Sequence, residues 1–104
     1  MDTLYLGARV RPDRVDITVI GPLTAPTTAQ LLAALGPHRR TATRLLLRTC
    51  TALDPDGLYA LLLAHIEAGE SGGTIYLLDV PPLIERYLRL HHAGHLLPPP
   101  EPRR

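Results

Sequence analysis

Residues 53–58 read Leu-Asp-Pro-Asp-Gly-Leu, and this stretch decides how the chain on either side is interpreted. Asp54 is a preferred helix N-cap residue, because its carboxylate can accept the unpaired backbone N–H groups of the first turn. Pro55 has no N–H and suits the first helical position. Asp56 places a negative charge at the positive end of the helix dipole. The stretch therefore predicts a helix that starts here and runs to about Ala68.

Strands and other helices alternate around this central helix. Residues 15–20 alternate apolar with polar and are rich in β-branched side chains, which is typical of a half-buried strand. The Gly-Pro pair that follows is expected to end it. The remaining predicted elements are strands at 4–10, 45–47 and 74–78, a helix at 27–35 with an apolar stripe of Leu31, Leu32 and Leu35, and a helix from 81–82 to about 91 or 92.

The resulting order, β-β-α-β-α-β-α, predicts an α/β fold with parallel strand pairs and right-handed crossovers. The chain has 104 residues, of which 45% are hydrophobic, and this suits one domain. We assign residues 1–97 to that domain and residues 98–104, which are rich in proline, to a flexible tail. Trp and Phe are absent, so the core must be aliphatic.

Charge, cysteine content and hydropathy exclude several classes of function. The formal net charge is +1, which provides no strong field toward nucleic acid or an acidic membrane. The single cysteine, Cys50, cannot form an internal disulfide and suits a reducing cytoplasm; we expect it to be a small core side chain. No apolar run is long enough for a membrane span.

Three segments, taken in order, resemble the STAS domain, the sulfate-transporter and anti-sigma-factor-antagonist family. Residues 21–24 (Gly-Pro-Leu-Thr) stand where the family has Gly-Glu-Leu-Asp, and residues 53–58 stand where it has an apolar residue followed by Asp-Ser-Ser-Gly-Leu. Residues 72–77 and 93–97 resemble its glycine-led last strand and closing Gly-Leu motif. The resemblance covers residues 4–97 and implies a mixed four-stranded sheet with three to four helices.

The resemblance also implies a role in bacterial partner-switching signalling. In anti-sigma-factor antagonists the second serine of Asp-Ser-Ser-Gly is phosphorylated by a partner kinase that is itself the anti-sigma factor. That position is Asp56 here, the first serine is Pro55, and Asp54 and Gly57 keep the family residues. A carboxylate cannot accept a phosphoryl group from a Ser/Thr kinase, so Asp56 either imitates a phosphoserine permanently or only completes the helix start. Thr24 replaces the acidic residue of the earlier loop.

The central helix is apolar on more than one side, which indicates a partner surface or burial all round. We expect one stripe to face the core, formed by Leu58, Leu61, Leu62 and Ile66. Tyr59 and Leu63 lie on another side, where they either meet a partner or are covered by the last helix or the first hairpin. The expected partner is an ATP-binding anti-sigma kinase or another STAS-type protein. The predicted partner-binding residues are Thr24, Asp54, Pro55, Asp56, Gly57, Tyr59 and Leu63.

Two other functions fit parts of the sequence. The chain could be a structural adaptor subunit that uses the same helix as a permanent interface. The Asp-Pro-Asp-Gly stretch also matches the Asp-x-Asp-Gly signature of haloacid-dehalogenase-type phosphotransferases, in which the first Asp is the nucleophile. That chemistry needs a cation, usually Lys, and later acidic residues; the chain has no Lys and offers only Asp79 and Glu85. We therefore expect a binding protein without cofactor rather than an enzyme.

The remaining chemistry-bearing residues are scattered. His91 and His95 stand four apart, as metal ligands on a helix do, but Gly94 predicts that the helix ends before His95. No metal site is expected. The only serine, Ser71, lies at the far end of the central helix, so a relocated phosphorylation site would be a threonine, with Thr49 and Thr51 nearest.

Overall fold

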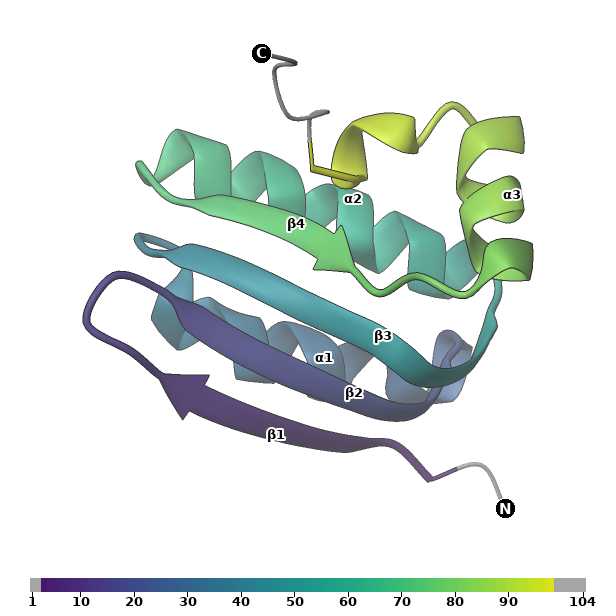
Figure 1. The fold of residues 1–104 in the computed structure, drawn as a ribbon, viewed down its shortest axis with the longest axis horizontal. Coiled ribbons are helices and arrows are strands. Elements are labelled where there is room, and N and C mark those ends of the chain that lie inside the picture. Colours follow the sequence, from purple (N-terminus) through teal and green to yellow (C-terminus); the bar gives the residue numbers. More distant parts are fainter. Residues whose placement is uncertain (1–2, 99–104) are drawn as a thin grey trace, which may run out of the picture.

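The computed structural model describes residues 3–98 and contains one mixed sheet of four strands (Figure 1). β1 (Tyr5–Val10) and β2 (Val15–Leu23) form an antiparallel hairpin. β3 (Ala42–Leu53) pairs in parallel with β2, and β4 (Thr74–Leu78) pairs in parallel with β3. The predicted α/β architecture and element order are confirmed. The predicted tail, residues 98–104, lies outside the described residues apart from Pro98.

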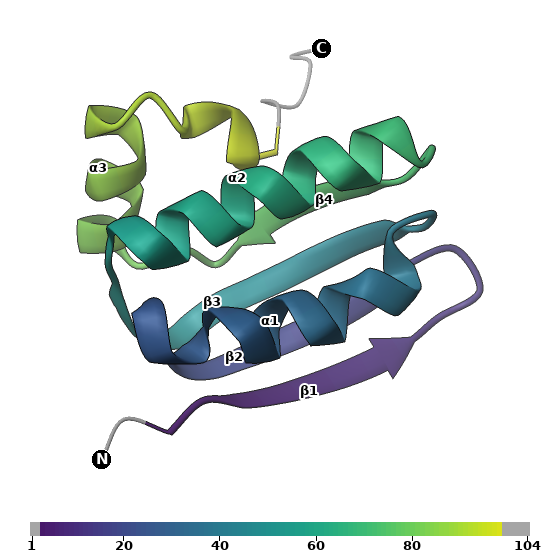
Figure 2. The same ribbon diagram turned by 180° about the vertical axis from the view of Figure 1, so that it is seen from behind.

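Helices cover one face of the sheet, and the opposite face is bare in the described part of the chain (Figures 1 and 2). α1 (Thr28–Leu35) and α2 (Pro55–Glu70) lie side by side on the covered face, and α3 (Pro82–Leu90) lies beyond the end of β4. None of these helices is long and apolar enough to cross a membrane. Three single-turn 3-10 segments complete the described chain: η1 (Ala25–Thr27), η2 (Gly36–His38) and η3 (Gly94–Leu96).

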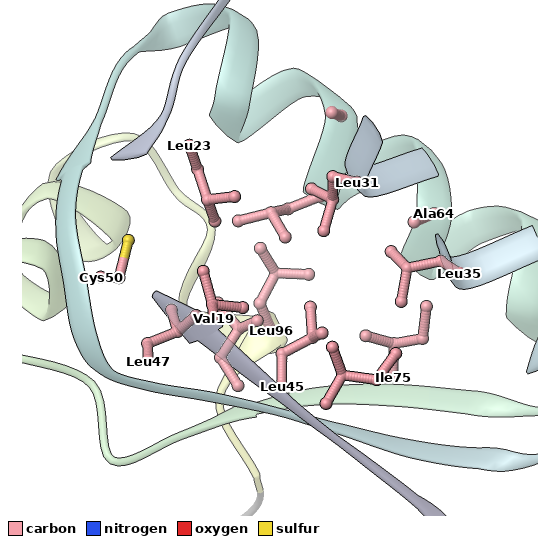
Figure 3. Packing of buried hydrophobic residues seen from close by; sticks show 14 of the residues in the cluster. Val19, Leu23, Leu31, Leu35, Leu45, Leu47, Cys50, Ala64, Ile75 and Leu96 are labelled. Atoms are coloured by element: carbon pink, nitrogen blue, oxygen red, sulfur yellow. The ribbon is translucent and has the colours of Figure 1, made fainter. Parts of the chain in front are cut away.

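The core lies between the covered face of the sheet and the helices, and Figure 3 shows its aliphatic packing. Each fully buried leucine, isoleucine or valine contributes about 1.5–3 kcal/mol by leaving water. Cys50 belongs to this core, as predicted, and its thiol donates to the carbonyl of Ala52 at 3.4 Å. The large side chains that are fully buried come from every layer: Ile17, Leu23, Leu31, Leu45, Leu47, Leu61, Leu77, Leu88, Leu96, Val15 and Val19.

Two strands are longer than predicted. β2 continues through Gly21 and Pro22, because its pairing with β1 ends at Ile20 and the missing N–H of Pro22 faces no β1 residue. Gly21 has a φ of +115°, and a Cβ there would press on the carbonyl oxygen of Thr3. β3 has 12 residues, but β4 pairs only with its first part, up to Leu46. The rest of β3 pairs only with β2.

The buried face of α2 differs from the predicted stripe. Leu58 and Leu61 are buried as expected, whereas Leu62 is half-buried and Ile66 is 57% exposed. Small residues take the place of those two side chains on the buried face, namely Gly57, Ala60, Ala64 and Ala68. Because these residues are small, α2 packs closely against its neighbours, and the true stripe is rotated away from the largest side chains.

The bare face of the sheet carries one buried carboxylate in a cluster of arginines. Asp16 on β2 accepts from Arg44 on β3 at 2.8 and 3.1 Å, and from Arg11 and Arg14 of the hairpin turn at 3.1 and 3.3 Å. The hydrogen bonds from Arg44 hold the pKa of the Asp16 carboxyl well below its usual range. This cluster fastens the β1–β2 turn to the centre of the sheet.

Candidate functional site

The start of α2 is held by Asp54, the N-cap residue. One oxygen of its carboxylate accepts the backbone N–H of Gly57 at 2.8 Å, as predicted for a helix cap. The other oxygen accepts the N–H of Ala25 in η1 at 3.0 Å. The N–H of Asp54 itself donates to the carbonyl of Leu23 at 3.2 Å. Asp54 therefore joins the end of β2, the turn after it and the start of α2.

Gly57 is required by close packing rather than by backbone conformation. A Cβ at this position would press on the carbonyl oxygen of Leu23 and lie 2.7 Å from its carbonyl carbon. Because α2 begins directly against the end of β2, only glycine leaves room there. The glycine of the Asp-Pro-Asp-Gly stretch thus fixes how near the two segments approach.

The turn between β2 and α1 is held by Thr27. Its buried hydroxyl donates to the carbonyl of Pro22 at 2.9 Å and accepts the N–H of Thr24 at 3.0 Å. Thr24 is half-buried and lies at the start of this turn, immediately before η1. Thr27 and Asp54 therefore both hydrogen-bond to this turn.

A groove of about 270 Å³ lies between α1 and α2, beside this framework. The α2 wall consists of Asp56, Tyr59, Ala60 and Leu63. The opposite wall is formed by Ala25 of η1 together with Thr28 and Leu32 of α1. Most of the lining is apolar, and the exposed Asp56 contributes its charged side chain.

The structure brings three of the predicted partner-binding residues into this groove: Asp56, Tyr59 and Leu63. Tyr59 is 68% exposed and Leu63 is half-buried, so neither the last helix nor the first hairpin covers them. Pro55 is exposed next to Asp56. The other predicted residues, Thr24, Asp54 and Gly57, do not line the groove, and two of them build its framework.

The opposite wall of the groove was missed by sequence reasoning. Thr28 and Leu32 stand four residues apart on α1, a spacing that places them on one side of a helix. That periodicity was visible, but only the packing of α1 beside α2 decides which side of α1 meets α2. Ala25 gave no signal at all.

Comparison with known proteins identifies the fold. No protein-family model matches the sequence, and no curated protein matches it. Among solved structures, an anti-sigma factor antagonist from Mycobacterium paratuberculosis superposes with a TM-score of 0.80 at 19% identity, covering 93% of this chain and 85% of that one. The anti-sigma factor antagonist SpoIIAA in its unphosphorylated form gives 0.75 at 18% identity, covering 91% and 85%. An antagonist from Rhodobacter sphaeroides, described as a STAS domain, gives 0.62 at 13% identity, covering 90% and 95%.

The chain has the STAS fold. SpoIIAA of Bacillus in its phosphorylated form also has it, with a TM-score of 0.69 at 18% identity over 91% of this chain and 88% of that one. The resemblance inferred from residues 21–24, 53–58 and 72–77 is therefore confirmed at the level of the fold. In this STAS fold, α2 follows directly on the longest strand of the sheet, and its start stands beside the α1–α2 groove.

The only serine of the chain lies away from this groove. Ser71 is the C-cap of α2, at the opposite end of the helix from Asp56. It borders a larger and more polar hollow of about 610 Å³, whose other lining residues are Arg39, Arg40, Glu67 and Glu70. Charges of both signs line that hollow, and Ser71 at its border caps the end of α2 opposite Asp54. We therefore place the candidate site at the α1–α2 groove.

The other candidate residues are kept apart or occupied by the fold. Thr49 donates its hydroxyl to the carbonyl of Val19 at 2.7 Å. α3 ends at Leu90, so His91 and His95 are not on one helix. His95 instead packs its ring 5.2 Å from that of His65 on α2. No group of three or more metal-ligating side chains occurs within residues 3–98.

Proposed function

We propose that this chain is a protein-interaction module of bacterial partner-switching signalling, acting in the cytoplasm. It binds an ATP-binding anti-sigma kinase, or another STAS-type protein, through the start of α2 and the α1–α2 groove. The observation that carries this proposal is the combination of an exposed Tyr59, an apolar groove and the carboxylate of Asp56 on one surface. An exposed aromatic side chain beside an apolar hollow is the usual anchor of a protein interface.

The use of the two carboxylates favours binding over catalysis. Both oxygens of Asp54 accept backbone N–H groups, so the residue that a haloacid-dehalogenase-type enzyme would use as its nucleophile is engaged in the framework. Asp56 takes part in no ion pair within residues 3–98 and is exposed. It presents a constant negative charge to whatever fills the groove.

Because this charge is constant, the proposed interaction has no phosphorylation switch at position 56. In the resemblance to anti-sigma-factor antagonists, Asp56 occupies the position of the serine that a kinase phosphorylates. A carboxylate supplies part of the charge of a phosphate group, but unlike a phosphate group it cannot be removed. The partner therefore meets one fixed state of the surface. A serine at position 56 would restore the hydroxyl acceptor at an exposed helix start without disturbing the cap made by Asp54.

The test is capture of partners from host lysate by the tagged full chain, compared with two alanine variants on the same helix. Tyr59→Ala removes the exposed wall of the groove, and Ile66→Ala removes a similarly exposed side chain outside it. We expect wild type and Ile66→Ala to retain an ATP-binding kinase or a STAS protein, and Tyr59→Ala to bind it at least about tenfold more weakly. Equal capture by both variants would place the interface elsewhere.

A second measurement separates the signalling role from a structural adaptor role. The purified partner and ATP are incubated with wild type and with Asp56→Ser, and phosphate incorporation is followed. We expect phosphorylation at position 56 in the variant alone, with release of the partner. A partner that binds both proteins identically, with no transfer to either, would instead indicate a permanent subunit of a larger assembly.

A further inference from the structure

β1 forms an edge of the sheet that nothing in the described part of the chain covers. Figure 1 shows it at the margin, with β2 on one side and no element on the other. Five of its six residues are exposed and Leu6 is half-buried. Its exposed side chains include two large apolar ones, Tyr5 at 63% and Val10 at 70%.

The opposite edge of the sheet is treated differently. β4 has η3 packed beside it, and Leu96 of η3 and the preceding residue Ala93 are fully buried. Figures 1 and 2 both show this C-terminal segment near β4, whereas the β1 side is open. One edge is thus shielded by the chain itself and the other is left available.

β1 also lacks the devices that normally protect a free edge. Proteins usually place lysine, proline, a bulge or several charges there to prevent pairing with another strand. β1 has no lysine or proline, and its register with β2 is uninterrupted from Tyr5↔Ile20 to Val10↔Val15. Its only charged residue is Arg9. A regular row of unpaired backbone groups is therefore presented to solvent, and the chemistry that satisfies it is another extended strand.

We propose that β1 is a self-association edge, which pairs antiparallel with β1 of a second copy about a two-fold axis at Gly7. Residues 5, 7 and 9 lie on the bare face of the sheet, because they pair with the bare-face residues of β2. A two-fold axis perpendicular to the sheet places the bare faces of the two copies on the same side. Odd-numbered residues of one β1 can therefore stand opposite only odd-numbered residues of the other, and even-numbered residues opposite only even-numbered ones. The two four-stranded sheets then become one continuous sheet.

The strand is self-complementary in this register. Tyr5 stands opposite Arg9 of the second copy, twice in the dimer, which permits a cation–π contact. Leu6 stands opposite Ala8 on the helix-covered face, and Gly7 meets Gly7 on the axis without steric conflict. The two Arg9 side chains are separated by four residues along the strand, about 13 Å, which is beyond the Debye length of about 8–10 Å. Like-charge repulsion is therefore screened.

The size of the contact sets the expected strength. A pairing of two six-residue strands is a small contact, and we expect it to bury less than the roughly 1,000 Å² of a stable interface, so the proposed dimer is weak and forms as the protein concentration rises. β1 is separated from β3, which leads into α2, by β2. The dimer would thus carry two α1–α2 grooves.

The first test measures sedimentation of the full chain from about 5 to about 500 µM, a range that spans micromolar affinity. Wild type is expected to pass from monomer to dimer. Gly7→Lys is expected to remain monomeric, because it places two ammonium groups at the axis, and a side chain is tolerated since a Cβ at Gly7 meets nothing within 4 Å. Gly69→Lys on α2 is the matched control, with the same charge change at an equally open glycine. It should dimerise like wild type.

The second test fixes the register by disulfide formation. Gly7→Cys is expected to cross-link under mild oxidation, because the two cysteines face each other on the axis. Val10→Cys, on the same exposed edge, is not expected to cross-link, because the register keeps the Val10 positions of the two copies apart. Wild type that stays monomeric throughout, a dimer that persists in Gly7→Lys, or equal cross-linking of both cysteine variants would each overturn the proposal. Wild type that stays monomeric alone and pairs along β1 only with a host protein would point to an extended partner peptide instead, and would also overturn it.

Discussion

Asp54 and Ala25 are 29 residues apart in the chain, and the carboxylate of Asp54 accepts the backbone N–H of Ala25 at 3.0 Å. The same carboxylate caps α2 through Gly57. One side chain therefore fixes the turn after β2 and the helix after β3 in relation to each other. Asp56, two residues later, makes neither contact and supplies a charge to the lining of the groove. Framework and surface charge are thus separate functions of neighbouring residues.

Asp54→Ala should destabilise the protein more than Asp56→Ala. The first change removes a helix cap and leaves two backbone N–H groups without their acceptor, which we expect to cost about 1–2 kcal/mol. The second removes only a favourable charge in the first turn, and we expect a loss of about 0.5 kcal/mol or less. Urea unfolding of both variants measures the difference. Equal losses would contradict this division of roles.

Gly57→Ala should be strongly destabilising although alanine favours helices. Helix propensity alone would make the variant about 1 kcal/mol more stable, but its Cβ would collide with the carbonyl of Leu23. We expect a net loss of about 2 kcal/mol or more, since backbone must move. Gly69→Ala in the same helix is the control, because a Cβ there meets nothing within 4 Å. It should be neutral or slightly stabilising in thermal unfolding, and a similar loss in both variants would show that close packing at Gly57 is not the cause.

Asp16→Asn should reduce stability at neutral pH and flatten its dependence on acid. The Asp16 carboxyl has a pKa lowered by Arg44, so its stabilisation is fully present above the unfolded-state pKa of about 4 and is lost as pH falls through the lower folded-state value. We expect a loss of about 1 kcal/mol at pH 7, at the low end for charged hydrogen bonds because the arginines are partly exposed. Unfolding free energies measured from pH 7 to pH 3 test this. An unchanged slope in the variant would exclude Asp16 as its source.

Cys50 should resist thiol reagents in the folded protein. Burial raises the pKa of its thiol, so the reactive thiolate is scarce at neutral pH, and the buried side chain is also inaccessible. Labelling with an aromatic disulfide reagent should therefore follow global unfolding and accelerate across the urea transition. Rapid labelling without denaturant would show that the end of β3 opens locally. The same inertness leaves Gly7→Cys as the reactive thiol in the cross-linking test.

Local chemistry was sufficient to predict several elements. β4 was predicted at its observed bounds, and the start of α2 at Asp54 was predicted from capping preferences, because both signals depend on adjacent residues. The full length of β3 was not predicted, because its later residues pair only with β2 and need no continuous apolar run. Pro22 likewise indicated the end of the strand, although β2 continues through it because the pairing with β1 has already ended at Ile20.

The candidate site was predictable on its α2 side only. The spacing of Asp56, Tyr59 and Leu63 follows from one helix, and the structure places all three along the groove. The assignment of Ile66 to the core is wrong. Large apolar side chains indicate one stripe of the helix, whereas the face that α2 buries is rich in small residues. Thr28 and Leu32 complete the groove from a different helix, and their position depends on how α1 and α2 pack together.

The unequal pairing of β3 has a consequence for motion. Its first half has a strand on each side, whereas its second half, which leads into Asp54, has β2 alone. Amide hydrogen exchange should therefore be slowest in residues 43–46 and faster beyond Arg48, because opening the second half breaks one ladder instead of two. The end of the sheet that carries the start of α2 is then a separate, less stable cooperative unit. A docked partner could reshape it while the rest of the sheet stays intact.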